Sequence, residues 1–326
     1  MVVSTRDSRL TSGFGFALLS ASSFGLSGSL ARGLLDAGWS SASAVAARIL
    51  LAAAVLVPVA VVQLRGRWSL VWRNLRLIVG YGLVAVAGCQ LAYFNAVAHL
   101  QVGVALLIEY TAPVAVIGWL WLRHGQRPGW LTALGAVVGG TGLVLVLGLG
   151  SGVRISTVGT GWALAAMGGA AVYFVLSAKE DNGLPATVLA AGGLLLGGTT
   201  LMLAGLAGVV RLDTSRTSVA FAAFRVPWWL PVLALGVITA ALAYVAGIAA
   251  SRRLGSRLAS FVALFEVLAA LVFAWLLLGE SPRPIQLAGG ALIVAGVVAV
   301  KLGEPRPART PEGVERGRAR PASLPG

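Results

Sequence analysis

Long apolar runs are the feature that most constrains this chain. A membrane-spanning helix needs about 20 mostly apolar residues, and such runs recur between short polar segments from Gly13 to Val300. Hydrophobic residues make up 58% of the sequence and charged residues only 11%. Soluble chains carry about 25% charged residues. The chain therefore cannot cover a water-exposed surface, and we expect lipid to surround most of it.

We predict ten membrane-spanning helices joined by short loops, so the expected fold is all-α and integral to the membrane. The predicted spans are Gly13–Ala31, Ser43–Gln63, Leu77–Ala98, Val102–Leu122, Trp130–Leu147, Val158–Ser177, Ala186–Val210, Trp228–Ala250, Leu258–Leu278 and Ile285–Val300. The first apolar run is too long for the core of a signal peptide, and further spans follow it. We interpret it as an uncleaved first helix.

The distribution of basic residues predicts the orientation of these helices. Lys and Arg concentrate in the cytoplasmic loops of membrane proteins. If the N-terminus is cytoplasmic, the inner segments hold about three times as many Lys and Arg residues as the outer ones. We therefore expect a multi-pass protein of the plasma (inner) membrane with both termini in the cytoplasm. The same distribution explains the net charge of +14 without nucleic acid as a partner.

The ends of the two halves of the chain match at a fixed offset of 154 positions. The matched pairs are Trp121 and Trp275, Gly125 and Gly279, Pro128 and Pro282, Gly135 and Gly289, and Gly142 and Gly296. Matches of Trp, Gly and Pro are unlike the apolar identities that such a composition supplies freely, so they indicate an internal duplication. Five spans per half is an odd number, which predicts two inverted five-helix repeats. Inverted repeats are a common architecture of secondary transporters.

The duplication divides the chain into five expected parts. Residues 1–12 are a cytoplasmic N-terminus, and residues 13–148 the first repeat. Residues 149–157 are an extracytoplasmic linker, followed by the second repeat at 158–302. Residues 303–326 are rich in Pro, Arg and Gly and have no apolar period. We predict a disordered basic cytoplasmic tail there.

Two segments carry a resemblance to a known family. The sequence ASFVALFEVLAALVFAWLLLGE, from Ala259 to Glu280, and its first-half counterpart TAPVAVIGWLWL, from Thr111 to Leu122, resemble the EamA-type branch of the drug/metabolite transporter superfamily. This resemblance implies export, or less often import, of small polar or amphipathic metabolites, often by exchange or proton coupling.

The chain departs from the pattern of that family at two places. Each half of a family member commonly carries a Pro-Val step and a Gly-Glu ending. The first half here keeps Pro113 and Val114 but ends with Gln126 in place of the Glu. The second half keeps Glu280 but has Glu266 where the proline would be expected.

Ionisable residues inside predicted spans are the leading functional candidates, because a charge inside the bilayer is costly. They are Arg48, Glu109 and Glu266. The two carboxyl groups lie on similar faces of repeat-related spans, where they could line a substrate path and exchange a proton. The alternative for each is a fixed hydrogen bond to a neighbouring helix. Arg48 could pair with Glu109 or attract an anionic substrate group, or its side chain could reach the outer interface.

Six uncharged polar residues complete the candidate substrate pathway. They are Gln90, Tyr93, Asn95, Tyr110, Tyr173 and Tyr244. Each alone could make a hydrogen bond between helices. Together they supply the few polar groups that a small-molecule cavity needs.

These features favour a secondary transporter of a small molecule, such as an amino-acid-like compound. The chain lacks the motif GxxxxGK[ST], so no phosphate-binding loop powers it. We expect no cofactor, and no metal, because one cysteine and two histidines are too few for a structural zinc site. The sequence leaves open whether transport is coupled to a proton or to an exchanged counter-substrate, and whether the protein forms a homodimer. A membrane-embedded enzyme would need a cluster of His, Asp or Ser at one interface, which the sequence lacks, so we do not expect an enzyme. A non-transporting receptor or scaffold is the remaining alternative.

Overall fold

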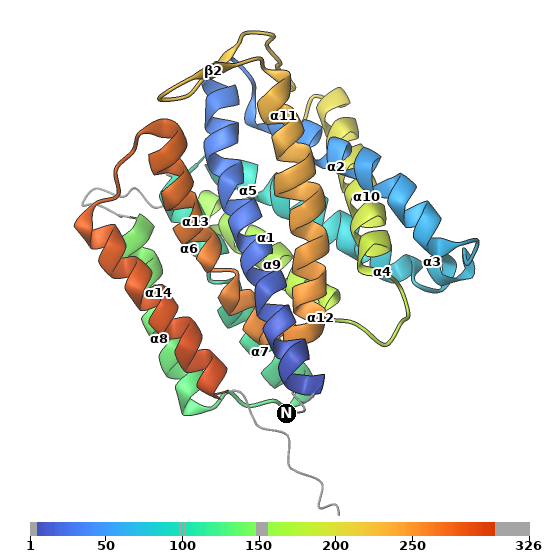
Figure 1. The fold of residues 1–326 in the computed structure, drawn as a ribbon, viewed down its shortest axis with the longest axis vertical. Coiled ribbons are helices and arrows are strands. Elements are labelled where there is room, and N and C mark those ends of the chain that lie inside the picture. Colours follow the sequence, from blue (N-terminus) through green and yellow to red (C-terminus); the bar gives the residue numbers. More distant parts are fainter. Residues whose placement is uncertain (1–4, 98, 101, 148–155, 304–326) are drawn as a thin grey trace, which may run out of the picture.

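The computed structural model of the protein describes residues 5–97, 99–100, 102–147 and 156–303 (Figure 1). Most of the expected linker at 149–157 and tail at 303–326 therefore lies outside the described residues. The elements of the first part are α1 (Thr5–Asp36), α2 (Ser41–Leu64), α3 (Ser69–Arg73), α4 (Leu75–Gly80), the π-helix η1 (Tyr81–Gly88), α5 (Cys89–Val97), α6 (Val102–Glu109), α7 (Ala112–His124) and α8 (Trp130–Leu147). Those of the second part are α9 (Thr157–Ser177), α10 (Ala186–Leu206), β1 (Val219–Ala220), β2 (Arg225–Val226), α11 (Trp229–Gly236), the π-helix η2 (Val237–Leu242), α12 (Ala243–Val262), α13 (Phe265–Phe273), the π-helix η3 (Ala274–Leu278) and α14 (Pro284–Gly303).

In these described residues, nine helices are long and apolar enough to cross a membrane. The difference from the sequence prediction concerns the expected span Leu258–Leu278, which is not one continuous helix. Its first residues belong to the candidate span Trp229–Val262, and Phe265–Leu278 is a shorter apolar helix. Gly255, with φ 78° and ψ 162°, interrupts the helical backbone within α12. The residues after Gly255 therefore form a separate helical segment that leads into α13.

Two helices are broken in the interior of the molecule. Between α6 and α7, Tyr110 and Thr111 form a turn, and Pro113 lies in the first turn of α7. Proline has no N–H to donate to the carbonyl oxygen four residues earlier, here that of Glu109, and its ring crowds that carbonyl, which explains this break. Between α12 and α13 the chain also passes through two residues outside both helices, and Glu266 N–H donates to the carbonyl oxygen of Ala263 at 2.9 Å. No proline is present there, so this turn has another cause.

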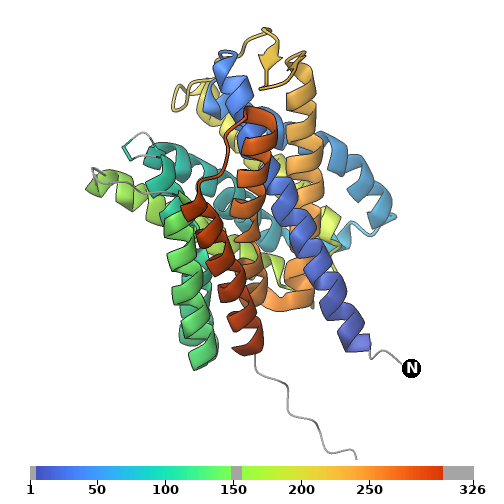
Figure 2. The same cartoon turned by 60° about the vertical axis from the view of Figure 1, so that its left-hand side comes forward.

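The helices pair in a regular way (Figures 1 and 2). Helix α1 packs against η2, α12 and α13, while α9 packs against η1, α5, α6 and α7. Helix α2 lies against α10, and α8 lies beside α14 at one edge of the molecule. The largest buried cluster, which includes Ile49, Tyr81 and Leu194, fills the space between α2, η1 and α10. Helix α1 with η2, α12 and α13 forms one group of packed helices, and α9 with η1, α5, α6 and α7 forms another.

Glycines hold α8 and α14 in close contact. A Cβ atom on Gly142 would lie 2.5 Å from the carbonyl oxygen of Gly289, and one on Gly135 would lie 2.6 Å from that of Gly296. Any larger residue would push the backbones apart. We call these four glycines the α8–α14 seam. Small residues allow helices to approach closely where lipid provides no hydrophobic drive for association.

A loop with the short hairpin β1–β2 covers the end of the bundle where α1 stops and α2 begins (Figure 2). The strands are antiparallel, with Val219 opposite Val226. The indole nitrogen of Trp39 donates to the carbonyl oxygen of Ser215 at 2.8 Å. The hydroxyl of Ser40 donates to the carbonyl oxygen of Arg211 at 2.7 Å. The α1–α2 turn is thereby fastened to the loop between α10 and α11.

The seam generates a stability prediction. We expect Gly142→Leu to lower the melting temperature of the detergent-solubilised protein, because overpacking a tight interface costs about 1–3 kcal/mol. Gly140→Leu on the same helix is the matched control, since a Cβ atom there would meet no heavy atom within 4 Å. Equal melting temperatures for the two variants, measured by differential scanning fluorimetry, would contradict the seam.

Candidate functional site

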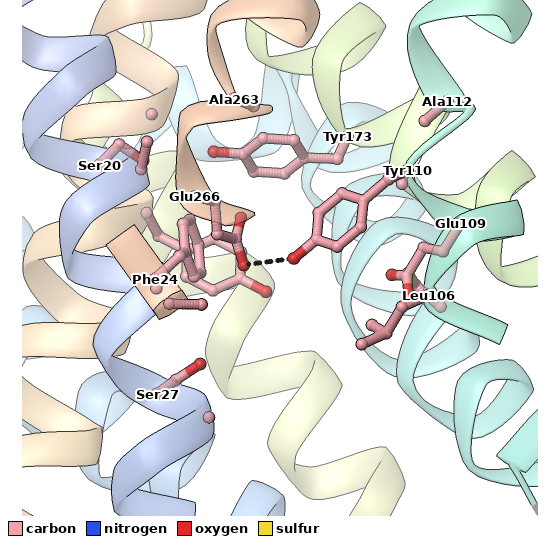
Figure 3. A pocket seen from close by; sticks show the side chains of 18 of the residues that line it. Ser20, Phe24, Ser27, Leu106, Glu109, Tyr110, Ala112, Tyr173, Ala263 and Glu266 are labelled. Atoms are coloured by element: carbon pink, nitrogen blue, oxygen red, sulfur yellow. Dashed lines mark hydrogen bonds between the residues drawn. The ribbon is translucent and has the colours of Figure 1, made fainter. Parts of the chain in front are cut away.

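A cavity of about 570 Å³ lies at the centre of the bundle. Its lining comes from α1, α2, α12 and α13 on one side and from α5, α6, α7 and α9 on the other. This volume falls within the range of about 300–1,000 Å³ typical of small-molecule sites. Figure 3 shows several of the side chains that line it.

Eight of the nine candidate residues line this one cavity. They are Arg48, Gln90, Tyr93, Glu109, Tyr110, Tyr173, Tyr244 and Glu266. The structure does not bring Asn95 to the cavity. Its side-chain nitrogen donates to the carbonyl oxygen of Leu91, one turn earlier in α5, at 2.7 Å. Asn95 is five residues from Gln90, so the two side chains lie on different faces of the helix.

Glu266 and Tyr110 meet across the cavity. The hydroxyl of Tyr110 donates to Oε1 of Glu266 at 3.0 Å (Figure 3). Tyr110 lies in the break between α6 and α7, and Glu266 lies in the first turn of α13. Because both helices begin or end here, the two side chains approach from helix ends rather than from continuous helix faces. The two breaks thus build the polar centre of the site.

Glu109 lies on the other side of Tyr110 (Figure 3). It is the last residue of α6, and its Oε1 accepts a hydrogen bond from the thiol of Cys89 at 3.5 Å. The thiol also lies 3.4 Å from the carbonyl oxygen of Ala166. Cys89 was not among the residues predicted from the sequence to line the substrate pathway. The Cys89 side chain is buried and lines the cavity. In the sequence, only its position next to the candidate residue Gln90 could have indicated this.

Arg48 is held at the cavity wall by a backbone group. Its Nη2 donates to the carbonyl oxygen of Thr239 at 2.7 Å, and its guanidinium lies 5.4 Å from the ring centre of Phe24. Thr239 belongs to the π-helix η2, and π-helical turns disturb the regular helical hydrogen bonding. Arg48 is in neither of the two salt bridges found between described residues, so the direct pair with Glu109, one of the alternatives that the sequence left open, is not among them.

Aromatic side chains form an apolar wall beside these charges. The rings of Phe24 and Tyr244 meet edge to face with centres 5.2 Å apart, and those of Tyr173 and Tyr244 lie 5.8 Å apart. Phe24, Ser20 and Ser27 of α1 also line the cavity, as Figure 3 shows. The sequence did not single out these three residues, because Phe and Ser are common in membrane helices and carry no charge.

The two ends of the cavity differ. At one end the lining includes Arg32 and Leu35, which are exposed at the C-terminal end of α1, and we call this end the mouth. At the other end it includes Ser251 and Ser260, each only 1% exposed. We call this the closed end.

Polar contacts between distant segments lie beyond the closed end. Nη2 of Arg257 donates to Oε1 of Gln126 at 3.3 Å, which joins α12 to the α7–α8 loop. Arg9 forms a salt bridge with Glu180, which joins α1 to the α9–α10 loop. The exposed residues that line the cavity thus lie at the mouth, and the lining residues at the closed end are buried.

A helical bundle with several apolar spans and a polar cavity at its centre is the arrangement of a multi-pass membrane transporter. The sequence profile of the EamA-like transporter family matches residues 11–148 and 157–302. These matches cover most of the chain, so the protein belongs to the EamA-like transporter family.

Individual relatives agree with this assignment. The chain is 27% identical over 248 residues to a probable terminal-alkyne amino-acid exporter of Streptantibioticus cattleyicolor. That alignment covers 73% of this chain and 78% of the exporter. A solved crystal structure, described only as that of a protein, matches with a TM-score of 0.70 and 21% identity. It covers 91% of this chain and 99% of that one, and this likeness concerns the fold alone.

Accessibility of the cavity can be measured by thiol labelling. In a Cys89→Ala background, we expect Ser27→Cys to react with a water-soluble maleimide, because Ser27 lines the cavity. Ala53→Cys is the control, since Ala53 is 1% exposed within the core. Intact-protein mass spectrometry reports the modified fraction. Equal labelling of both positions in the folded protein would argue against an accessible cavity.

Proposed function

We propose that the protein is a secondary transporter that exports small polar or amphipathic metabolites, amino-acid-like compounds among them, by alternating access. The observation that carries this proposal is the cavity: charged and polar side chains line it, and its exposed lining residues, among those described, lie at the mouth. The amino-acid exporter among the relatives supports the substrate class. A non-transporting receptor or scaffold is the alternative function.

We further propose the architecture of ten membrane helices in two inverted repeats, 13–148 and 158–302. Three observations support it. The seam glycines are pairs separated by 154 positions, and Gly135 approaches Gly296 while Gly142 approaches Gly289. The break at Tyr110 and Thr111 and the break at Ala263 and Leu264 also lie at nearly the same offset.

The third observation is the exchange of partners between the repeats. Helix α1 packs against η2, α12 and α13 of the other repeat, and α9 packs against η1, α5, α6 and α7 in the corresponding way. Two equivalent bodies would then face each other across the cavity. Relative movement of these two bodies would close the mouth and open the closed end, as in other transporters with inverted repeats.

If both termini lie in the cytoplasm of a plasma membrane, α1 runs outward and ends at Asp36 on the outer side. The mouth, which lies at the C-terminal end of α1, therefore faces outward. In this orientation the closed end faces the cytoplasm, and we propose that the linker at 149–157 lies outside the membrane and the tail at 303–326 in the cytoplasm. Proton coupling through Glu109 or Glu266, exchange with a counter-substrate, and assembly as a homodimer are parts of the proposal that need separate tests.

The function is tested by flux. We expect cells that lack the protein to accumulate its substrates, and proteoliposomes containing the purified protein to move those compounds across the membrane. Comparison of intracellular metabolites with and without the gene identifies the compounds to load. Absence of flux for every accumulated compound, from a protein that remains folded, would favour a receptor or scaffold.

Coupling to protons is tested with conservative variants. We expect the double variant Glu109→Gln, Glu266→Gln to transport more slowly and with an altered dependence on pH, because an amide cannot take part in proton exchange. Glu280→Gln is the control, since Glu280 is exposed outside the cavity. Normal transport with an unchanged pH dependence in the double variant would exclude a proton role for both residues.

The contact between Arg257 and Gln126 predicts how the closed end opens. Gln126→Glu would turn a neutral acceptor into a charged one, and charge-assisted hydrogen bonds are roughly twice as strong as neutral ones. We expect slower transport and increased labelling of Ser27→Cys by an impermeant maleimide outside cells. Gln126→Ala should change the labelling in the opposite direction. Identical labelling in both variants would show that this contact does not control access.

A further inference from the structure

A second pocket, which shares no lining residue with the central cavity, lies near the start of α1 and the start of α10. It holds about 570 Å³. Its walls include Arg9 of α1, Arg252 and Arg253 of α12, Glu180 of the α9–α10 loop and Ala186, the first residue of α10. The start of α1 and the loop that leads into α10 both lie toward the lower end of the molecule in Figure 1. We call this site the arginine pocket.

The arginine pocket has an excess of positive charge. Three arginines line it against one acid, Glu180, and that acid already forms a salt bridge with Arg9. Neither Arg252 nor Arg253 is in a salt bridge between described residues. Arginine is well suited to phosphate, because its planar group donates several hydrogen bonds in a fixed geometry. The pocket therefore presents two guanidinium groups that no carboxylate of the described chain neutralises by direct contact.

The contacts of each arginine show which nitrogens can meet a ligand. Nε and Nη2 of Arg252 are buried without a hydrogen-bond partner among the described residues, so a ligand in the pocket would meet Nη1. Nη1 of Arg253 donates to the carbonyl oxygen of Ala249 at 2.9 Å, and its guanidinium lies 4.6 Å from the ring centre of Phe16. These two contacts hold Arg253 at the pocket wall. Within the described part of the chain, its other nitrogens make no hydrogen bond and can bind an anion.

Arg9 can exchange its partner. The side chains of Arg9 and Glu180 are each 51% exposed. Exposed salt bridges contribute little to stability, because water screens both charges. A phosphate group in the pocket can therefore compete with Glu180 for the guanidinium of Arg9.

The depth of the pocket indicates the source of the anion. The candidate membrane span of α1 starts at Arg9, and that of α10 starts at Ala186. The pocket thus lies at the level where the membrane begins, which is the level of the phospholipid headgroups. In the orientation proposed above, it faces the cytoplasmic leaflet. Basic pockets between helices on that side of a membrane bind anionic lipid headgroups.

We propose that the arginine pocket binds the phosphate group of an anionic phospholipid, with Arg9, Arg252 and Arg253 donating to the phosphate oxygens. The bound lipid joins three segments that are distant in the sequence, namely α1, α12 and the α9–α10 loop. It therefore stabilises the folded protein. This site does not depend on which compound the central cavity carries, so its tests are independent of the flux experiments.

Lipid binding to the purified full-length protein tests the proposal. Native mass spectrometry of the detergent-solubilised protein can be titrated with phosphatidylglycerol and, separately, with phosphatidylcholine, whose choline group balances the phosphate charge. We expect the apparent dissociation constant for the first phosphatidylglycerol to be about tenfold lower or more, because hydrogen bonds to charged groups are the stronger ones. Equal dissociation constants for the two lipids would overturn the proposal.

A soluble phosphate compound offers the same chemistry, and a thermal shift experiment distinguishes it from a lipid. We expect phosphatidylglycerol to raise the melting temperature. Inorganic phosphate should leave it unchanged when chloride keeps the ionic strength constant. An equal rise with inorganic phosphate would assign the pocket to a soluble ligand and overturn the assignment to a lipid.

Variants assign the lipid to this pocket. The double variant Arg252→Gln, Arg253→Gln should bind phosphatidylglycerol about tenfold more weakly. The control Arg73→Gln, Arg76→Gln removes the same charge from exposed positions outside the pocket and should bind like the unmodified protein. Glu180→Gln removes the competing acid and should strengthen binding about threefold, a gain that a purely structural role would not produce. Unchanged or weaker binding in Glu180→Gln, or equal binding in the two double variants, would overturn the assignment.

Discussion

Inside a bilayer, every backbone N–H and C=O group must find its partner within the protein, because lipid offers none. This constraint decides where a helix can stop. The breaks at Tyr110 and Thr111 and at Ala263 and Leu264 both lie at the cavity, where other protein groups and solvent can satisfy the freed backbone. The carbonyl oxygen of Thr239, which binds Arg48, belongs to a π-helix that also borders this region. The polar chemistry of the site thus depends on irregular backbone.

The close contact of α8 and α14 complements this irregular centre. Four glycines let the two backbones touch. The internal match relates Gly135 to Gly289 and Gly142 to Gly296, and in the structure the partners are exchanged, so that Gly135 contacts Gly296 and Gly142 contacts Gly289. Lipid provides no hydrophobic drive between helices, so this pair relies on direct packing. The tightly packed pair of α8 and α14 at the edge of the molecule thus contrasts with the broken helices at its centre.

Much of this could be predicted from the sequence, and particular residues show where prediction failed. The cost of charge in lipid identified Arg48, Glu109 and Glu266, and all three line the cavity. Asn95 was expected there too, but a side-chain amide can bond to its own helix, and pattern alone cannot reveal that choice. The break at Ala263 and Leu264 inside the expected span Leu258–Leu278 was missed, because no proline marks it in the sequence.

Hydrogen–deuterium exchange in lipid nanodiscs measures the central claim, that broken helices border an accessible cavity inside an otherwise protected bundle. The account predicts that peptides covering residues 106–113 and 260–267 exchange faster than those covering α8 and α14. Exchange in the two break regions as slow as that in α8 and α14 would contradict it, because the backbone there would then be as regular and as inaccessible as a continuous membrane helix.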